Sequence, residues 1–453
     1  MQKVLIANRG EIAVRIIRAC HDLGLQTVAV YSTADSEALH VLHADEAICI
    51  GEAPSHKSYL KIPNILSACE ITGADAIHPG YGFLSENANF ASICESCRLN
   101  FIGPSSQAIA LLGDKAKAKA TAKAAGCPVI PGSEGVVVDL KQALHEADQL
   151  GYPIFIKAVA GGGGKGIRIA YDEDEFTRQF AAARAEAEVN FGNPDVYLEK
   201  MIMHPRHIEV QILGDKHGHY IHLGERDCTT QRRRQKLIEE APSPVLTPKM
   251  RQKIGHAAVS VVKAAGYYSA GTIEFLLDRD QNFYFMEVNT RIQVEHTVTE
   301  ELTGVDLLVE QLRIARGEKL RYSQKEINFE GHVIQYRINA ENPAQNFAPS
   351  PGKLEYYLPP GGPHVRVDSA CYSGYSIPPN YDSMVAKLIV KGRDRLEAIA
   401  RGKRALREFH IGGVSSTIPF HLYMMEDEKF LSANFDLTYI DGLVADGCNF
   451  TLE

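Results

Sequence analysis

The sequence lacks any long apolar run. None of its 453 residues belongs to a window approaching the ~20 apolar residues that a membrane span requires. Near the N-terminus only Val4–Ala7 is continuously apolar, which is too short for the core of a signal peptide. We therefore expect no membrane association and a cytoplasmic location.

The sequence also lacks a surplus of positive charge and a cysteine framework. It has 48 Lys and Arg against 56 Asp and Glu, a net charge of −8, which argues against general nucleic-acid binding. Its nine cysteines are scattered and odd in number, which favours a reducing compartment over disulfides. Cys94 and Cys97 form a CxxC without a second pair, which is more typical of an ordinary helix than of a metal site.

A glycine run, AGGGGK at 160–165, is the most unusual local feature that is present. It is not a Walker A loop, because Gly166 follows Lys165 where Ser or Thr is required. A dinucleotide fingerprint should open a helix, but the alternation at 167–170 predicts a strand. Strand, glycines and strand indicate either a hairpin lid over phosphates or a surface turn. As a lid, the hairpin should stay mobile until ATP binds.

The chain length suggests two or three domains, and no internal repeat is visible. Strand–helix units from residue 3 predict a parallel sheet up to about residue 114, and PVIPGS at 128–133 resembles a linker. The glycine hairpin, a helix at 173–189 and the strand VYLEKMI form a compact unit. A strand-rich segment starts at His207, and a last α+β segment starts at GHVIQYRINAENP.

The densest chemistry lies in FMEVNTRIQVEH, 285–296, where five polar residues occupy odd positions: Glu287, Asn289, Arg291, Gln293 and Glu295. We expect the first two on a strand, and then a bend that returns the others to the same cavity. Glu274 lies in the preceding strand, so a hairpin would set it beside Glu287. Two carboxylates and an amide oxygen suit Mg²⁺ and nucleotide phosphates, whereas a solvated strand face is the alternative.

A basic run in GERDCTTQRRRQK contains Arg232–Arg234 and Lys236. Such runs are usually solvated, and less often they bind nucleic acid. In an acidic chain we expect a positive pocket for a small anion instead.

Eight segments together resemble the biotin carboxylase family of ATP-grasp enzymes, in sequence order and at its spacings. They are IANRGEIAVRIIRA, HPGYGFLSENANFA, GDKAKAK, AGGGGKGIR, HPRHIEVQ, GERDC..QRR.QK, EVNTRIQVEH and RINAENP. The resemblance implies an α/β and α+β architecture. Its parts would be a Rossmann-like parallel-sheet domain at 1–114, an ATP-grasp domain at 115–330 with a mobile glycine-rich lid at 131–203, and a C-terminal α+β domain at 331–446.

The resemblance also implies which residues form the site. Nucleotide contacts fall on Lys115, Lys157, Gly162, Gly163, Gly164, Glu199, Lys200, Ile202, His207, Gln231, Glu274 and Glu287. Metal ligands fall on Glu274, Glu287 and Asn289. The bicarbonate site falls on Lys236, Arg291, Gln293, Val294 and Glu295, and the biotin site on Tyr81 and Arg337. The implied catalytic residues are Glu295 as general base, Arg291 and Lys236 holding bicarbonate, and Arg337 stabilising the biotin oxyanion.

The sequence departs from the family at three places. Arg234 stands where the family usually has His, Thr297 where it usually has Pro, and the lid tip carries four glycines rather than five. None of these changes removes an implied catalytic group.

The resemblance implies ATP and bicarbonate as substrates, Mg²⁺ or Mn²⁺ with two ions expected, and carboxyphosphate as intermediate. Biotin would arrive on a separate biotin carboxyl carrier protein, since the 453 residues contain no AMKM-like segment and no room for a carboxyltransferase. Carboxyltransferase subunits of an acetyl-CoA carboxylase, serving malonyl-CoA and fatty acid synthesis, and a second copy in a homodimer are the expected partners. Rival interpretations are a carboxylate–amine ligase, a carbamoyl-phosphate-type synthetase, or a non-enzymatic nucleotide-binding regulator.

Overall fold

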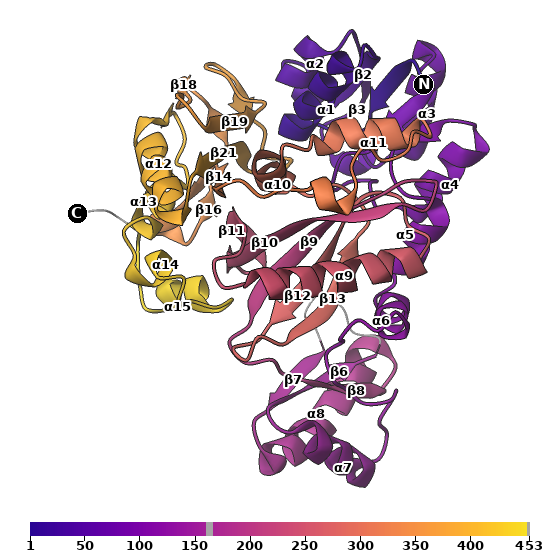
Figure 1. The fold of residues 1–453 in the computed structure, drawn as a ribbon, viewed down its shortest axis with the longest axis vertical. Helices are drawn as coiled ribbons and strands as arrows, with labels where there is room; N and C mark the ends of the chain where they lie inside the picture. The colour runs from indigo at the N-terminus through magenta and orange to yellow at the C-terminus, as the bar shows by residue number, and fades with distance from the viewer. Residues whose placement is uncertain (160–165, 451–453) are drawn as a thin grey trace.

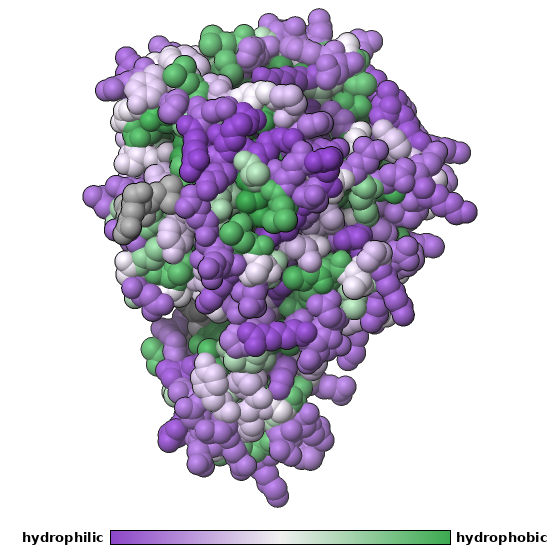
Figure 2. Space-filling view, turned by 60° about the vertical axis from the view of Figure 1, so that its left-hand side comes forward, coloured by the Kyte–Doolittle hydropathy of each residue, from purple (hydrophilic) through white to green (hydrophobic). Residues whose placement is uncertain are grey.

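The computed structural model describes residues 1–159 and 166–450. An N-terminal α/β unit, a central large sheet and a C-terminal unit form the main body, and a small unit protrudes from it (Figure 1). Across these described ranges, no helix has the length and apolar character needed to cross a bilayer. Seen from the side in Figure 2, the surface is mainly hydrophilic, with apolar residues in small separate groups.

The N-terminal unit is a five-stranded parallel sheet in the order β3-β2-β1-β4-β5. Its strands are β1 (Lys3–Ile6), β2 (Gln26–Ser32), β3 (Glu46–Gly51), β4 (Ala76–His78) and β5 (Asn100–Phe101). Its helices are α1 (Gly10–Asp22), α2 (Leu39–His43), α3 (Ile62–Thr72), α4 (Ala88–Ser96) and α5 (Ser106–Gly113), and α6 (Lys115–Ala124) follows. The predicted parallel sheet is therefore confirmed. Strand β3 was not predicted, because it is half-exposed at the sheet edge and has no regular apolar pattern.

The protruding unit is a three-stranded antiparallel sheet, β7-β6-β8, packed on two helices. Its elements are α7 (Leu140–Leu150), β6 (Ile154–Ala158), β7 (Ile167–Ala170), α8 (Glu173–Phe191) and β8 (Val196–Lys200). Lys157 pairs with Ile167, so the segments on either side of the glycine run are antiparallel strands, as predicted. The glycines implied in nucleotide contact, Gly162, Gly163 and Gly164, lie outside the described residues.

The central sheet has eight antiparallel strands in the order β13-β12-β9-β10-β11-β14-β21-β19. They are β9 (Arg206–Gly214), β10 (Tyr220–Arg232), β11 (Gln235–Ala241), β12 (Ser269–Leu277), β13 (Phe283–Asn289), β14 (His332–Asn339), β19 (Val365–Ser369) and β21 (Met384–Gly392). The helices beside it are α9 (Pro248–Ala264), α10 (His296–Thr303) and α11 (Leu307–Ala315). Strands from both sides of residue 330 belong to this one sheet. The domain boundaries predicted at residues 114 and 330 remain predictions.

The two faces of β9 show how the sheet places polar groups. Ile208, Val210 and Ile212 pack in one core with α9 residues such as Ile254 and Ala258. The intervening polar residues, including Glu209, project to the opposite face. That face carries the candidate site.

The C-terminal unit completes the fold around β14 and β21. Its remaining elements are β15 (Glu341–Asn342), β16 (Ala348–Pro349), β17 (Gly352–Lys353), β18 (Tyr356–Leu358), β20 (Ser376–Ile377), β22 (His410–Gly412), α12 (Arg395–Glu408), α13 (Ile418–Met424), α14 (Glu428–Leu431) and α15 (Tyr439–Ala445).

Gly402 on α12 is one position in this unit where an added side chain would clash. A methyl group there would overlap the hydroxyl of Tyr336, which is fully buried, and lie 2.8 Å from its Cζ. Gly402→Ala should therefore destabilise the protein by about 1–3 kcal/mol in thermal or denaturant unfolding. Gly442→Ala on α15 is the matched control, because nothing lies within 4 Å of the added atom. The helix propensity of alanine should make that control stabilising, and equal effects of the two substitutions would contradict the explanation.

Candidate active site

The hairpin of β12 and β13 brings two acidic residues together. Glu274 and Glu287 are direct partners in the strand register, with a β-bulge just after Glu274. Glu274 is buried, whereas Glu287 is more exposed and lies 3.4 Å from Lys115 Nζ. Asn289, at the end of β13, donates from Nδ2 to Glu274 Oε1 at 2.9 Å. The hairpin predicted for Glu274 and Glu287 is thus present.

After β13 the chain bends, and the bend returns the next polar residues towards the hairpin. Arg291 donates to Asn289 Oδ1 and to Gln293 Oε1, both at 3.1 Å. Gln293 donates to Glu274 Oε1 at 3.2 Å. Arg291 also contacts Glu86 of the N-terminal unit at 2.9 Å. The odd-numbered residues therefore gather in one place, as their parity and the expected bend indicated.

Lys236, on β11, stands among three buried carboxylates. Its Nζ lies 2.6 Å from Glu295 Oε1, 2.7 Å from Glu209 Oε2 and 3.1 Å from Glu274 Oε1. Burial alone would lower the pKa of Lys236, but the three carboxylates hold it well above the usual range. Lys236 is consequently charged at neutral pH.

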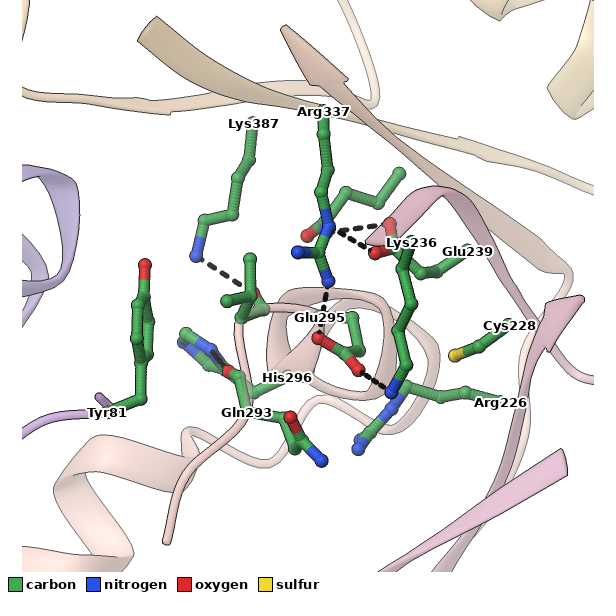
Figure 3. Close-up of polar contacts among 12 residues, drawn as sticks. Tyr81, Arg226, Cys228, Lys236, Glu239, Gln293, Glu295, His296, Arg337 and Lys387 are labelled. Atoms are coloured by element: carbon green, nitrogen blue, oxygen red, sulfur yellow. Dashed lines mark hydrogen bonds and ion pairs between the residues drawn. The ribbon is translucent and has the colours of Figure 1, made fainter. Parts of the chain in front are cut away.

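Glu295 precedes α10 and lies at the centre of the cluster, between Lys236 and Arg337 (Figure 3). Arg337 Nη2 on β14 is 2.9 Å from Glu295 Oε2, and its Nε donates to Glu239. Burial would raise the pKa of Glu295, but Lys236, Arg337 and Arg226 hold it well below its usual range. Glu295 is therefore an ionised carboxylate, fully buried and positioned by two cations.

Tyr81 belongs to the loop after β4, and in Figure 3 it lies on the opposite side of Glu295 from Lys236. Its hydroxyl donates to Glu11. Burial first, and then the charge of Glu11, raise the pKa of this hydroxyl well above its usual value. Tyr81 is thus a neutral hydrogen-bond donor.

The residues expected around the nucleotide lie along β6, β8, β9 and β10. Lys157 pairs with Glu199, and Lys119 approaches the same carboxylate at 3.2 Å. Lys200 Nζ donates to Gly151 O at 2.6 Å, and Ile202, just after β8, is partly buried. His207 Nε2 lies 3.1 Å from Glu274 Oε2, and Gln231 Nε2 lies 3.2 Å from His207 Nδ1. His207 and Gln231 therefore adjoin the acidic hairpin.

The basic run does not form one pocket, which corrects the sequence-based expectation. Arg232 packs over Phe347, 4.8 Å from the ring centre, and donates to Asn346. Arg233 and Arg234 are exposed at the β10–β11 turn with left-handed backbone, φ 48° and 67°. Strand alternation and the turn separate the four side chains, so Lys236 alone of the run reaches the carboxylates.

Sequence reasoning missed several groups that complete the site. They are Glu11, Glu209, Arg226, Glu239 and Lys387, all buried. Arg226 is fully buried and donates from Nε to Glu209. Its Nη1 donates to Gln211 Oε1 at 2.7 Å and to Thr299 Oγ1 at 3.0 Å. One signal was available: in HIEVQILG, polar residues alternate with apolar ones along a strand that is buried throughout. Alternation alone also fits a strand with one face in solvent, and it is the burial of both faces in the structure that shows a polar face lining a closed site.

The fold and the site together define an ATP-grasp enzyme: an eight-stranded antiparallel sheet with buried carboxylates and basic groups gathered on one face, and a small three-stranded unit beside it. Three family models cover the chain in order. "Biotin carboxylase, N-terminal domain" matches 1–109, "Carbamoyl-phosphate synthase L chain, ATP binding domain" matches 114–323, and "Biotin carboxylase C-terminal domain" matches 335–442.

Similar proteins match this chain over almost its whole length. Biotin carboxylase 1 of Bacillus subtilis is 57% identical, covering 97% of this chain and 98% of that protein. A pyruvate carboxylase subunit of Methanothermobacter thermautotrophicus is 53% identical, covering 97% and 89%. The biotin carboxylase domain dimer of Hydrogenobacter thermophilus 2-oxoglutarate carboxylase, solved with MgADP and bicarbonate, is 50% identical with a TM-score of 0.90, covering 100% and 99%. The chain belongs to the biotin carboxylase family, whose members are ligases that carboxylate biotin at the expense of ATP.

Proposed function

We propose that this chain carboxylates biotin carried on a biotin carboxyl carrier protein, using ATP and bicarbonate through carboxyphosphate. The observation that supports this most directly is the Glu295 carboxylate, fully buried and held between Lys236 at 2.6 Å and Arg337 at 2.9 Å. A carboxylate that keeps its charge in a closed site can take a proton from an anion that the same cations bind. The Hydrogenobacter domain was solved with bicarbonate and MgADP, which supports the same substrates here.

In the proposed mechanism Lys236 and Arg291 hold bicarbonate in line with the γ-phosphate, with Gln293 and Val294 beside it. Glu295 accepts the bicarbonate proton. Among the cations that lower its pKa, Lys236 has the largest effect, so sharing Lys236 with a bound anion raises the proton affinity of Glu295 as the base is needed. The bicarbonate oxygen attacks the γ-phosphorus, and ADP leaves.

Carboxyphosphate then breaks its C–O bond to give CO₂ and phosphate inside the closed site, where carboxyphosphate is shielded from water. Phosphate takes the proton of the biotin ring nitrogen, and this nitrogen forms the new bond to the carbon of CO₂. Arg337 stabilises the charge that develops on the biotin ureido oxygen, and Tyr81 lies beside the ring.

The nucleotide in this proposal lies between the lid and the central sheet. Lys115, Lys157, His207 and Gln231 would contact it, and Glu199, Lys200 and Ile202 would read the adenine. The lid glycines would close over the phosphates. Support comes from His207 and Gln231, which adjoin the hairpin expected to hold the metal.

Glu274, Glu287 and Asn289 fit a hard divalent cation, Mg²⁺ or Mn²⁺. Their support is the direct register of the two carboxylates and the position of Asn289 beside them, where its amide nitrogen donates to Glu274 at 2.9 Å. The oxygen of the Asn289 amide, which accepts from Arg291 in this structure, would be the atom that binds the cation. When bound, Mg²⁺ neutralises phosphate charge as it develops. Burial would raise the pKa of Glu274, but Lys236 and then His207 hold it below the usual range, so this carboxylate carries the negative charge that a divalent cation requires.

The deciding experiment measures ADP release with ATP, Mg²⁺ and bicarbonate, with and without free biotin. Stimulation by biotin is expected from a biotin carboxylase. Release that depends on an amine or on ammonia instead would favour the carboxylate–amine ligase or carbamoyl-phosphate alternative. No Mg²⁺-dependent turnover at all would favour a nucleotide-binding regulator.

We further propose that the biotin carrier is a separate protein and that the enzyme works as a homodimer within an acetyl-CoA carboxylase, supplying malonyl-CoA for fatty acid synthesis. The near full-length match to a Bacillus biotin carboxylase supports this, and the Hydrogenobacter domain is described as a dimer. Relatives also belong to pyruvate and 2-oxoglutarate carboxylases, so the carboxyltransferase partner must be tested directly. A cytoplasmic location stays a prediction.

Mass spectrometry of the purified chain should find no covalently attached biotin, and an extract depleted of the chain should stop making malonyl-CoA from acetyl-CoA. Biotin bound to this chain would contradict the separate carrier. Loss of oxaloacetate formation from pyruvate, with malonyl-CoA formation intact, would contradict the acetyl-CoA carboxylase assignment.

A further inference from the structure

Lys387 is a completely buried lysine on β21 that none of the proposed steps uses. Its side chain is 0% exposed, and its Nζ lies 3.0 Å from Val294 O and 3.0 Å from Glu11 Oε2. Burying an ammonium is costly unless it is paired and hydrogen-bonded. The position of this lysine therefore matters for the two groups that it joins.

The first group is the backbone of residues 292–295, which includes the 293–295 turn. Each carbonyl of residues 292–295 has a partner. Ile292 O accepts from Arg291 at 3.2 Å, Gln293 O from the His296 ring at 2.7 Å, and Glu295 O from Val298 N at 3.2 Å. These three partners come from the turn itself or from the start of α10.

Val294 O differs, because it is held by Lys387, 93 residues further along the chain. The peptide plane that carries this carbonyl also carries the N–H of Glu295. A rotation of that plane would therefore turn the predicted base away from Lys236 and Arg337.

The second group is the Glu11–Tyr81 pair of the N-terminal unit, with Glu11 on α1 and Tyr81 on the loop after β4. Tyr81 donates to one oxygen of Glu11, and Lys387 pairs with the other. In Figure 3 the polar ends of Tyr81 and Lys387 lie towards one another. The other nearby acid, Asp368, is 4.0 Å from Lys387 and makes two 2.8 Å contacts with Arg366. Lys387 is thus shared chiefly between the turn and Glu11.

We propose that Lys387 is a positioning residue for the reaction: it holds the 293–295 turn in the geometry that binds bicarbonate, and through Glu11 it fixes the hydroxyl of Tyr81 on the biotin side. This inference rests on the proposed function of the same site. Three segments far apart in the sequence, at Glu11, Val294 and Lys387, meet in this one junction. Bicarbonate geometry and biotin geometry therefore share a support that touches neither substrate.

Removing the ammonium leaves Val294 O without its donor and the buried Glu11 without its counter-charge. The second defect alone would lower stability, because an unpaired buried charge is strongly unfavourable. A purely structural role predicts that restoring charge balance also restores activity. A positioning role predicts that it restores stability only.

The test compares the whole enzyme with Lys387→Met, Glu11→Gln and the double variant, which removes both charges. Lys391→Met is the matched control, because Lys391 lies on the same strand and donates to Glu301 O at 3.0 Å, away from the site. The measurements are the melting temperature and the KM values for bicarbonate and ATP in biotin-dependent ADP release.

Lys387→Met should raise the KM for bicarbonate about tenfold, consistent with a small displacement of reacting groups, and leave the KM for ATP within about twofold. The double variant should regain thermal stability and keep the raised KM for bicarbonate, and it carries the test if Lys387→Met fails to fold. Lys391→Met should change neither KM.

Recovery of the wild-type KM for bicarbonate in the double variant would overturn the inference, as would equal rises in both KM values. Absence of biotin-dependent ADP release from the wild-type enzyme would overturn the proposed function itself, and the inference with it.

Discussion

Glu295→Gln should lower bicarbonate-dependent ATP cleavage and biotin carboxylation together, each by about 10²–10⁴-fold, the usual cost of losing a general base. The substitution keeps the shape of the side chain but removes the proton acceptor. It also turns an amide N–H towards Lys236 or Arg337, where both carboxylate oxygens now accept, at 2.6 and 2.9 Å. Both activities should fall because no carboxyphosphate forms.

Glu240→Gln is the control for losing a buried carboxylate. Glu240 lies on the same strand as Lys236 and is held by His332 and Arg395, each at 2.7 Å, away from the proposed site. It should lose stability with little change in kcat. If Glu295→Gln retains ATP cleavage while biotin carboxylation alone falls, the base must be another residue.

Arg337→Ala should separate the two half-reactions. Biotin carboxylation should fall by about 10²–10³-fold, by analogy with the loss of an oxyanion donor, while slow bicarbonate-dependent ATP hydrolysis survives. Arg337 is one of the cations that lower the pKa of Glu295, so its removal leaves a stronger base for the first step. Coupled ADP release and carboxybiotin formation measure the two steps on the same sample.

Stability alone cannot decide the role of Arg337, because its guanidinium also pairs with buried Glu239. Arg337→Ala leaves that carboxylate unpaired and should lower the melting temperature in either case. The control is Arg337→Met combined with Glu239→Gln, which removes both charges. Equal loss of the two activities in that balanced variant would show that Arg337 only supports the structure.

Local patterns in the sequence determined much of the architecture. Apolar strands alternating with helices predicted the N-terminal parallel sheet, and the glycines between two alternating segments predicted a hairpin. The shared parity of Glu287 to Glu295, with one bend, predicted that these residues gather. Each inference depends on a period of two or 3.6 residues, which neighbouring residues alone establish.

The lid tip and the individual residue roles remain predictions. The lid glycines lie outside the described residues. The roles of Lys115, Lys157 and Gln231 came from a family resemblance rather than from their local pattern, and only substrate complexes or variants can test them.

Tertiary structure alone decided which charges face the site. Arg232 and Lys236 belong to the same basic run in the sequence, and nothing local distinguishes their roles. The β10–β11 register places Arg232 over Phe347 and Lys236 among three carboxylates. Lys387 meets Val294 only because β21 lies beside β14 in the sheet. Strand order and register are set by packing of the whole sheet, and a shift of one residue would turn each of these side chains to the opposite face. For that reason local periodicity predicted the strands, whereas the ion-pair network around Glu295 required the assembled sheet.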